Sequence, residues 1–279
     1  MIHTSENCIA FSDIVVGTDI PLPYPTLAYS GNRTPDDTYA FVLLEKPLVP
    51  DTAPVTRQGG SEIYRTEHGR LRIYTALTAA DGCQVACLFS DDGRHTMYYP
   101  ASRWEFYKNP LHCAHLLCGE MLLLRHRAFL LHSSVVLYRG KTVLFSGPSG
   151  VGKSTQAALW KDVLGADILN DDRCVIMEKN GMFFGGGSIW AGTSGIYRPE
   201  QAPISGIFLL EQAETTRVTP AGAEAFAPLF SQTILNTWDS AFMETVTGLY
   251  DHLLSQVPVY RLSCRADKDA VLAAHDVLF

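Results

Sequence analysis

The sequence predicts an α/β fold built on a mixed sheet, preceded by a smaller, mainly β N-terminal domain. Three observations carry this prediction. Residues 1–108 contain short β-branched or aromatic runs that alternate with turn residues. From residue 109 onward, apolar runs of helical length alternate with runs of strand length. A glycine-rich stretch, GPSGVGKST at residues 147–155, stands between a strand-like run and a helix-like run.

Residues 1–108 are expected to form a mainly antiparallel β domain. Its strand candidates are TYAFVLLEK, SEIYRTE, RLRIYTAL and CQVACLFS, and the turn candidates around them are GNRTPDD, RQGG, EHG and DDGR. No motif in this region indicates chemistry, so recognition of a substrate or a partner is the role considered for it.

A second domain is expected over residues 109–279. Its first segment, LHCAHLLCGEMLLLRHRAF, is long and apolar enough for one mostly buried helix. Two apolar strands, roughly 130–138 and 142–146, follow as a hairpin that turns at Gly140. The helix after the glycine-rich stretch is expected to stop at Gly165. Further strands are expected in ADIL, ISGIFLLEQA and VPVYRLSC, and further helices in GAEAFAPLFSQTIL, AFMETVTGLYDHLLSQ and DKDAVLAAHDVL.

Charge and hydropathy exclude several classes of function. The net charge is −7 with no Lys/Arg-rich run, so a nucleic-acid partner is not expected. No stretch reaches the roughly 18 apolar residues of a membrane span. The N-terminus has no basic start followed by an apolar core, which predicts no signal peptide and a cytoplasmic protein.

The chain has seven cysteines and no CxxC motif. An odd number without metal-ligand spacing predicts buried, reduced thiols, and a zinc site is the alternative.

The stretch GPSGVGKST matches G-x-x-x-x-G-K-[ST], a loop that wraps a phosphate chain. Its glycines permit backbone conformations that turn amide groups inward, and the following helix presents its N-terminus to the same negative charge. Lysine can reach the β and γ phosphates, and the serine hydroxyl can hold Mg²⁺. The alternative is a glycine-rich turn with a chance Lys-Ser pair. ATP and Mg²⁺ are therefore the expected cofactors, bound by Gly147, Pro148, Ser149, Gly150, Val151, Gly152, Lys153, Ser154 and Thr155.

Asp171 and Asp172 follow Lys153 by 18 and 19 residues, at the end of the strand candidate ADIL. This strand is expected beside the strand that leads into the loop. A carboxylate there can bind Mg²⁺ or accept a proton from an attacking hydroxyl, and two adjacent acids can divide these roles. The alternative is an acidic surface turn.

The stretch from His132 to Asp172 resembles the catalytic domain of HPr kinase/phosphorylase, whose fold is shared with phosphoenolpyruvate carboxykinase. The matching elements are His132, the turn at Gly140, GPSGVGKS and NDD. Taken alone, a histidine in LLHSSVV reads as a core or turn residue. The segments LLHSSVV, WAGTSGIYR and PVYRLSCRADKDAV are also similar to HPr kinase-like proteins encoded beside peptide-modification genes, some of which phosphorylate a precursor peptide.

The resemblance implies an ATP-dependent kinase that phosphorylates a Ser or Thr of a peptide or small protein. Lys153 would grip the phosphates, while Ser154 and Asp172 would bind Mg²⁺. Asp171 would be the base that deprotonates the acceptor, and His132 would line the phosphate site. The resemblance also implies a homo-oligomer.

The chain departs from that family in one segment. The family's Glu-Ile-Arg-Gly stretch is absent, and GGGSIWAGTSGIYRPE occupies roughly its place. This departure speaks against phosphorylase activity and against HPr as the substrate. Arg198 and Arg217 are the candidates for the missing positive charge. WAGTSG, residues 190–195, is expected either as a loop over the nucleotide or substrate, or as a plain hairpin loop.

Two other functions fit the same loop and acidic pair. A small-metabolite kinase would use both. Such kinases usually begin at the loop strand and carry an Arg-rich lid, whereas this sequence predicts a hairpin before the loop and has no Arg-rich segment. A nucleotide-sensing module without transfer activity is the second alternative, and the missing Glu-Ile-Arg-Gly stretch favours it.

Overall fold

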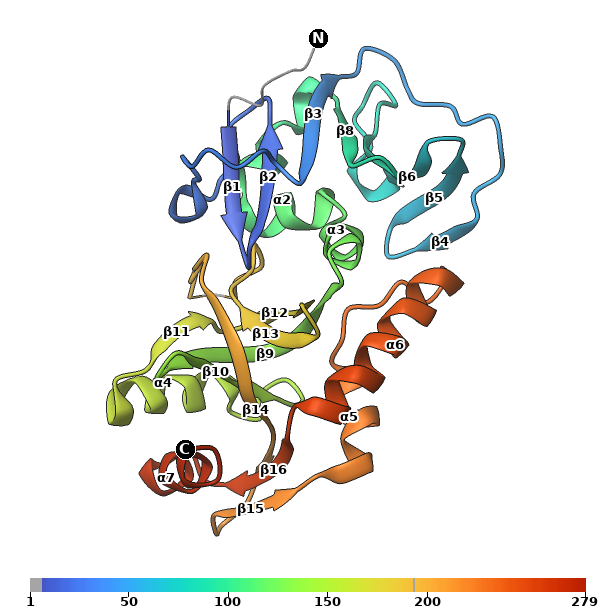
Figure 1. Ribbon diagram of the computed structural model, residues 1–279. Helices are drawn as coiled ribbons and strands as arrows, with labels where there is room; N and C mark the ends of the chain where they lie inside the picture. The colour runs from blue at the N-terminus through green and yellow to red at the C-terminus, as the bar shows by residue number, and fades with distance from the viewer. Residues whose placement is uncertain (1–6, 193) are drawn as a thin grey trace. The chain divides into compact units, whose positions relative to one another are not determined.

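The computed structural model describes residues 7–192 and 194–279, and it shows a mixed α/β protein with two eight-stranded sheets (Figure 1). The chain divides into two compact units. The N-terminal unit comprises the described part of Met1–Ala10 together with Ile14–Leu122. The C-terminal unit comprises Phe11–Asp13 and Leu123–Phe279. The expectation that the N-terminus carries no signal peptide falls partly on residues 1–6, which lie outside the described residues.

The N-terminal unit contains a sheet in the order β1-β2-β3-β8-β7-β6-β5-β4. The four strands expected from the sequence form as β3, β5, β6 and β7, and β1, β2, β4 and β8 are additional. Most pairs are antiparallel, but β3 pairs in parallel with both β2 and β8, so the sheet is mixed. The strands are β1 Asn7–Phe11, β2 Ile14–Thr18, β3 Asp37–Leu43, β4 Thr56–Gln58, β5 Ser61–Thr66, β6 Gly69–Tyr74, β7 Val85–Ser90 and β8 Arg94–Tyr99.

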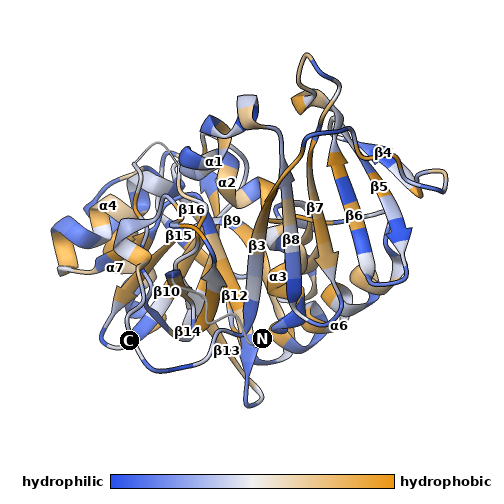
Figure 2. Ribbon diagram, turned by 90° about the horizontal axis from the view of Figure 1, so that it is seen from above, coloured by the Kyte–Doolittle hydropathy of each residue, from blue (hydrophilic) through white to orange (hydrophobic). Residues whose placement is uncertain are grey.

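Hydropathy distinguishes neighbouring strands within this sheet. Strand β7 is hydrophobic along its length, whereas hydrophobic and hydrophilic residues alternate in β6 (Figure 2). The alternation in β6 does not follow burial, because Arg72 is buried and Leu71 is half-buried. The buried residues of β7 include Val85, Ala86 and Cys87, each at 0% exposure.

Three short helices follow this sheet: α1 Glu105–Lys108, α2 Pro110–Leu116 and α3 Gly119–Arg125. The sequence predicts a single long helix over α2 and α3. Cys118 interrupts it with a φ of 50°, a left-handed conformation that a continuous helix excludes. The hydroxyl of Tyr39 donates to the carbonyl of Leu117 at 2.7 Å, which ties this region to the first sheet. The division between the units consequently falls after Leu122 rather than at the expected 108/109.

The C-terminal unit contains a sheet in the order β10-β9-β12-β13-β14-β16-β15, with β11 paired to β9 and an additional parallel pair between β10 and β14. Two long strands, β9 and β14, each take different neighbours along their length. The strands are β9 Ala128–Tyr138, β10 Lys141–Ser146, β11 Asp167–Asn170, β12 Arg173–Lys179, β13 Met182–Gly186, β14 Gln201–Gln212, β15 Arg217–Pro220 and β16 Val259–Cys264.

Strands β9 and β10 form the hairpin that the sequence predicts. They pair antiparallel from Lys141 opposite Tyr138 to Ser146 opposite Ser133. Arg139 and Gly140 have φ values of 48° and 72°, which is the geometry of a tight two-residue hairpin turn. This pairing delivers the end of β10 to the glycine-rich loop.

One expected neighbour relation is wrong. The ADIL strand, β11, lies beside β9 and not beside β10, the strand that leads into the loop. The reason is that β10 already has a neighbour on each edge, its hairpin partner β9 on one and β14 on the other. The acidic pair therefore comes close to the loop across β9.

Helices cover both faces of this sheet. Leu144 of β10 belongs to a core cluster that includes residues of α5 Phe226–Ser231 and α6 Ser240–Gln256. Val143 and Phe145 belong to a second cluster with residues of α4 Lys153–Leu164 and α7 Lys268–Asp276. Successive side chains of a strand point to opposite faces, so this division places the two helix pairs on the two faces of β10.

Further expectations concern a helix end, the cysteines, a metal site and a membrane span. Helix α4 ends at Gly165, whose φ is 72°, as predicted. The seven cysteines are not joined in disulfide bonds; six are buried and Cys8 is half-buried. No set of three His, Cys, Asp or Glu side chains within residues 7–192 and 194–279 is placed to hold a metal ion. Across the same residues, no helix has the length and apolar character needed to cross a membrane.

Candidate nucleotide-binding site

The glycine-rich loop connects the end of β10 to the start of α4. Gly147 and Gly152 have φ values of 148° and 112°, which side chains rarely permit. A Cβ atom at Gly147 would lie 3.2 Å from Val151 Cγ1 and 3.3 Å from the carbonyl oxygen of Leu210. The loop thus has the strand-to-helix context that its motif requires, and its conformation depends on glycine.

Lys153 lies inside the loop. Its side chain curls back so that Nζ donates to the carbonyl oxygens of Gly147 at 2.9 Å and Pro148 at 3.1 Å. The residue is only 6% exposed. Burial lowers the pKa of the ammonium, and the negative charge of Asp172 partly offsets that shift. The ammonium therefore occupies the concave side of the loop, where phosphate oxygens could replace the two carbonyls.

Asn170 holds the acidic turn after β11 in place. Its Oδ1 accepts from the backbone amides of Asp172 at 2.9 Å and Arg173 at 2.8 Å. Its Nδ2 donates to the carbonyl oxygen of Trp190 at 2.7 Å. The asparagine is fully buried, and bonds from a side chain to its own following backbone are typical of such turns. Sequence analysis did not assign this residue a role, although an Asn before two acids is a turn signal.

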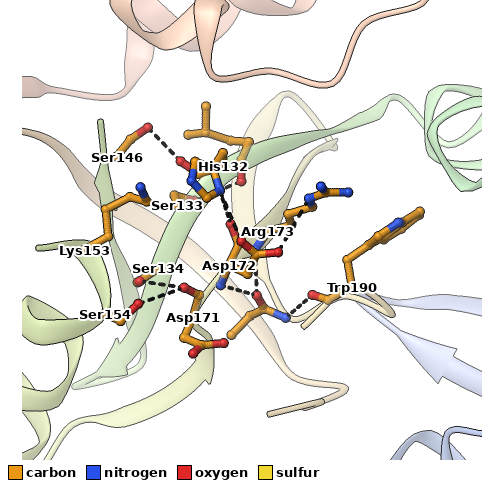
Figure 3. A network of polar contacts seen from close by, with 12 residues as sticks. His132, Ser133, Ser134, Ser146, Lys153, Ser154, Asp171, Asp172, Arg173 and Trp190 are labelled. Atoms are coloured by element: carbon orange, nitrogen blue, oxygen red, sulfur yellow. Dashed lines mark hydrogen bonds and ion pairs between the residues drawn. The ribbon is translucent and has the colours of Figure 1, made fainter. Parts of the chain in front are cut away.

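His132 and Asp172 form a pair at the edge of this turn (Figure 3). His132 Nδ1 lies 2.9 Å from the carbonyl oxygen of Asp172 and 3.3 Å from its Oδ1, so the ring donates from Nδ1. The hydrogen bond from His132 lowers the pKa of Asp172, the charges of Arg173 and Lys153 lower it further, and burial opposes them. Asp172 is therefore ionised, and a cation or phosphate-bound metal is the natural ligand for it.

Asp171 points its carboxylate away from His132 (Figure 3). Its carbonyl oxygen accepts from the hydroxyls of Ser134 at 3.1 Å and Ser154 at 3.3 Å. Its Oδ1 is buried and has no hydrogen-bond partner among the described residues. The backbone of Asp171 thus joins β9 and α4, whereas one oxygen of its carboxylate is left without a hydrogen bond among the described residues.

The segment after β13 lies against this acidic turn. A Cβ atom at Gly192 would be 3.2 Å from Asp172 Cβ and 3.5 Å from Asp171 Oδ1. Trp190 is 6% exposed, and its carbonyl is held by Asn170. Thr193 lies outside the described residues. Residues 190–192 are therefore packed against the carboxylates, and a role over a nucleotide or substrate stays a prediction.

The arginines differ from the expectation. Arg198 bonds Glu200 at 2.6 Å and lies 3.9 Å from Asp167, so its charge is already paired. Arg217 is an exposed residue of β15, the strand at the sheet edge that pairs with β16. The arginine that the structure brings to the acidic turn is Arg173, whose Nε lies 3.6 Å from Asp172 Oδ2. Sequence analysis missed Arg173, although it directly follows the acidic pair.

The residues present fit Mg²⁺ by their donor chemistry. Magnesium takes oxygen ligands and is usually held by one or two protein oxygens together with phosphates and water. The Ser154 hydroxyl and the ionised Asp172 carboxylate are such donors, and both belong to segments that meet at Asp171 and Asp172. These residues would hold the ion beside the loop.

Comparisons with known proteins add little to this geometry. No family model matches the chain, and no curated protein matches it. Among solved structures, the chain is similar to the Hpr(Ser) kinase/phosphatase from Coxiella burnetii, with 12% identity and a TM-score of 0.30 over 53% of this chain and 92% of that chain. A likeness at this TM-score assigns the chain to no family.

Proposed function

We propose that this protein is an ATP- and Mg²⁺-dependent kinase that transfers the γ-phosphoryl group to a Ser or Thr hydroxyl of a peptide or small protein. The observation that carries the proposal is the meeting of the glycine-rich loop with the acidic turn. Ser154 is the serine of the motif's Gly-Lys-Ser sequence, and its hydroxyl donates to the backbone carbonyl of Asp171. A phosphate chain held by the loop would therefore end beside the two carboxylates.

The two acids have different surroundings, which supports different roles. Asp172 is held by His132, Arg173 and Lys153 in its ionised form, which suits a metal ligand. The carboxylate of Asp171 has an oxygen without a partner, which suits a base that takes a proton. In the reaction, the acceptor oxygen bonds to the γ-phosphorus, the bond to the β,γ-bridging oxygen breaks, ADP leaves, and the hydroxyl proton moves to Asp171.

Charge neutralisation is the larger part of the catalysis. Lys153 and the loop amides would stabilise the phosphoryl oxygens as the γ-phosphoryl group is transferred. When bound, Mg²⁺ would supply further positive charge at these oxygens. His132 would line the phosphate site and, through Nδ1, hold Asp172. The choice of a peptide or small-protein acceptor rests on the resemblance in the sequence.

The test is transfer of label from γ-labelled ATP to peptides containing Ser or Thr, with small alcohols as competing acceptors. Lys153→Ala is expected to lower transfer by about 10²–10³-fold because it removes a charge at the phosphoryl oxygens. The matched control is Lys161→Ala, an exposed lysine of the same helix, which should leave transfer unchanged.

The two acids are separated by their response to Mg²⁺. Asp171→Asn should lower kcat by about 10²–10⁴-fold at every Mg²⁺ concentration, as expected for loss of a general base. Asp172→Asn should instead raise the Mg²⁺ concentration needed for half-maximal rate. Label on small alcohols alone would favour a metabolite kinase, and ATP binding without transfer would favour a nucleotide-sensing module; either contradicts the proposal.

A further inference from the structure

A cavity of about 550 Å³ adjoins the glycine-rich loop. It opens where three neighbouring parallel strands end: β10, β14 and β16. Crevices at the carboxyl ends of parallel strands are common ligand sites, and the volume lies within the roughly 300–1,000 Å³ of small-molecule pockets. All of its lining residues belong to the C-terminal unit.

The residues that line the cavity indicate which end of a bound nucleotide would lie in it. Gly150, Gly152 and Thr155 of the loop line the cavity, whereas Lys153 and the acidic pair do not. If the γ-phosphate lies beside Lys153 and the acids, the chain's other end points toward the cavity. That end of a nucleotide carries the sugar and the base.

Gln156 supplies the polar group of the inner wall. It follows Thr155 on α4 and is 1% exposed. Its Nε2 donates to Cys264 Sγ at 3.5 Å, while Oε1 has no hydrogen-bond partner among the described residues. Trp160 Nε1, one turn further along α4, also lacks a partner but does not line the cavity. An unpaired buried acceptor costs about 1–3 kcal/mol, so a ligand donor that reaches Gln156 would recover that cost.

We propose that this cavity binds the base of an adenine nucleotide and that Gln156 Oε1 accepts a hydrogen bond from the exocyclic amino group. This inference rests on the proposed function, because it takes the loop as the phosphate site. The bond from Nε2 to Cys264 Sγ holds the orientation of the carboxamide, so Oε1 is the atom left to contact the base. Guanine carries a carbonyl oxygen where adenine carries the amino group, so two acceptors would face each other and guanine would be disfavoured.

The test measures dissociation constants of ATP, GTP and inorganic triphosphate by equilibrium dialysis. The wild-type protein should bind ATP about tenfold more tightly than GTP. Gln156→Met, which keeps the length of the side chain without its polar atoms, should bring that ratio close to one through weaker ATP binding. Triphosphate should bind both proteins equally, since it reaches only the loop.

The matched control is Gln256→Met, because Gln256 is an exposed glutamine of α6 that does not line the cavity. It should leave the ATP to GTP ratio unchanged. Thermal melting checks the fold of each variant, and Gln156→Leu replaces Gln156→Met if the latter does not fold.

Each outcome is decisive. A wild-type protein that binds ATP and GTP equally, or a ratio that survives the loss of Gln156, overturns the inference while leaving the proposed function intact. A protein that binds neither ATP nor triphosphate contradicts the proposed function itself.

Discussion

The two units each bring a basic side chain, an acid and polar neighbours together, yet they expose them differently. In the N-terminal unit, Arg72 Nη2 lies 2.7 Å from Glu120 Oε1, and the two side chains are 8% and 9% exposed. In the C-terminal unit, the side chains of His132 and Asp172 are each 29% exposed. The charged pair is therefore buried in the N-terminal unit, whereas the pair of the C-terminal unit is partly exposed to solvent.

This difference separates a structural cluster from a candidate site. Burial opposes the charge of Glu120, but Arg72 holds the pKa of that carboxyl below its ordinary value. The two buried side chains therefore neutralise each other's charge, in a position too buried for a ligand to reach. The partly exposed pair instead sits beside a glycine-rich loop and an Asp171 oxygen without a partner among the described residues. Exposure, more than residue type, therefore points to function here.

Breaking the buried pair should give the largest effect. Arg72→Met leaves Glu120 buried without its cation, which is expected to lower the free energy of unfolding by about 3–5 kcal/mol. Urea denaturation followed by circular dichroism measures the change. The double variant Arg72→Met/Glu120→Leu should recover most of the loss, since apolar side chains often replace a buried pair without penalty. Equal stability of the single variant and the wild type would show that the pair is not structurally important.

Loosening the acidic turn should have the next largest effect. Asn170→Ala leaves the amides of Asp172 and Arg173 without their acceptor, at a cost of about 1–3 kcal/mol, and should lower phosphoryl transfer. Asn170→Asp keeps that acceptor but loses the donor to Trp190, so it should be intermediate in both measurements. Undiminished transfer in Asn170→Ala would separate the turn from catalysis.

The two arginines give a smaller and more specific comparison. Arg173→Met should raise the pKa of Asp172, because the Arg173 charge lowers it in the wild type. The acid limb of the pH–rate profile should then move to higher pH, with a loss of rate of about tenfold. Arg198→Met should leave both unchanged, since Arg198 is bonded to Glu200. Equal effects of the two variants would contradict the inference that Arg173 lowers the pKa of Asp172.

The pH dependence of stability should show the smallest effect. The pKa of Asp172 is depressed in the folded protein, first by the hydrogen bond from His132. Its stabilising contribution is therefore present above the unfolded-state pKa of about 4 and is lost as pH falls through the lower folded-state pKa. Unfolding free energies of wild type and Asp172→Asn should converge as pH drops below about 4. A constant difference down to pH 2 would contradict the depressed pKa.

The elements closest to the loop are those that local sequence determined. The hairpin before it, the turn at Gly140, the start of α4 and its stop at Gly165 follow from apolar runs and glycine positions within a few residues. Such signals are local, because a strand period, a glycine φ or a helix end depends on neighbours in the chain. The break at Cys118 shows the limit, since the one glycine of that run, Gly119, stands a residue after the left-handed position.

Relations between distant segments were decided only by the tertiary structure. The neighbour of β11 depends on which edges of β10 are already taken, and a sequence pattern does not encode that. The same holds for the arginines: Arg173 and Arg198 look alike in sequence, but Glu200 pairs with one and Asp172 lies beside the other. By itself, the sequence determined the loop, the acidic pair and the elements that carry them. Which side chains were left unpaired beside them, Asp171 and Gln156 among them, depended on packing between segments far apart in the chain.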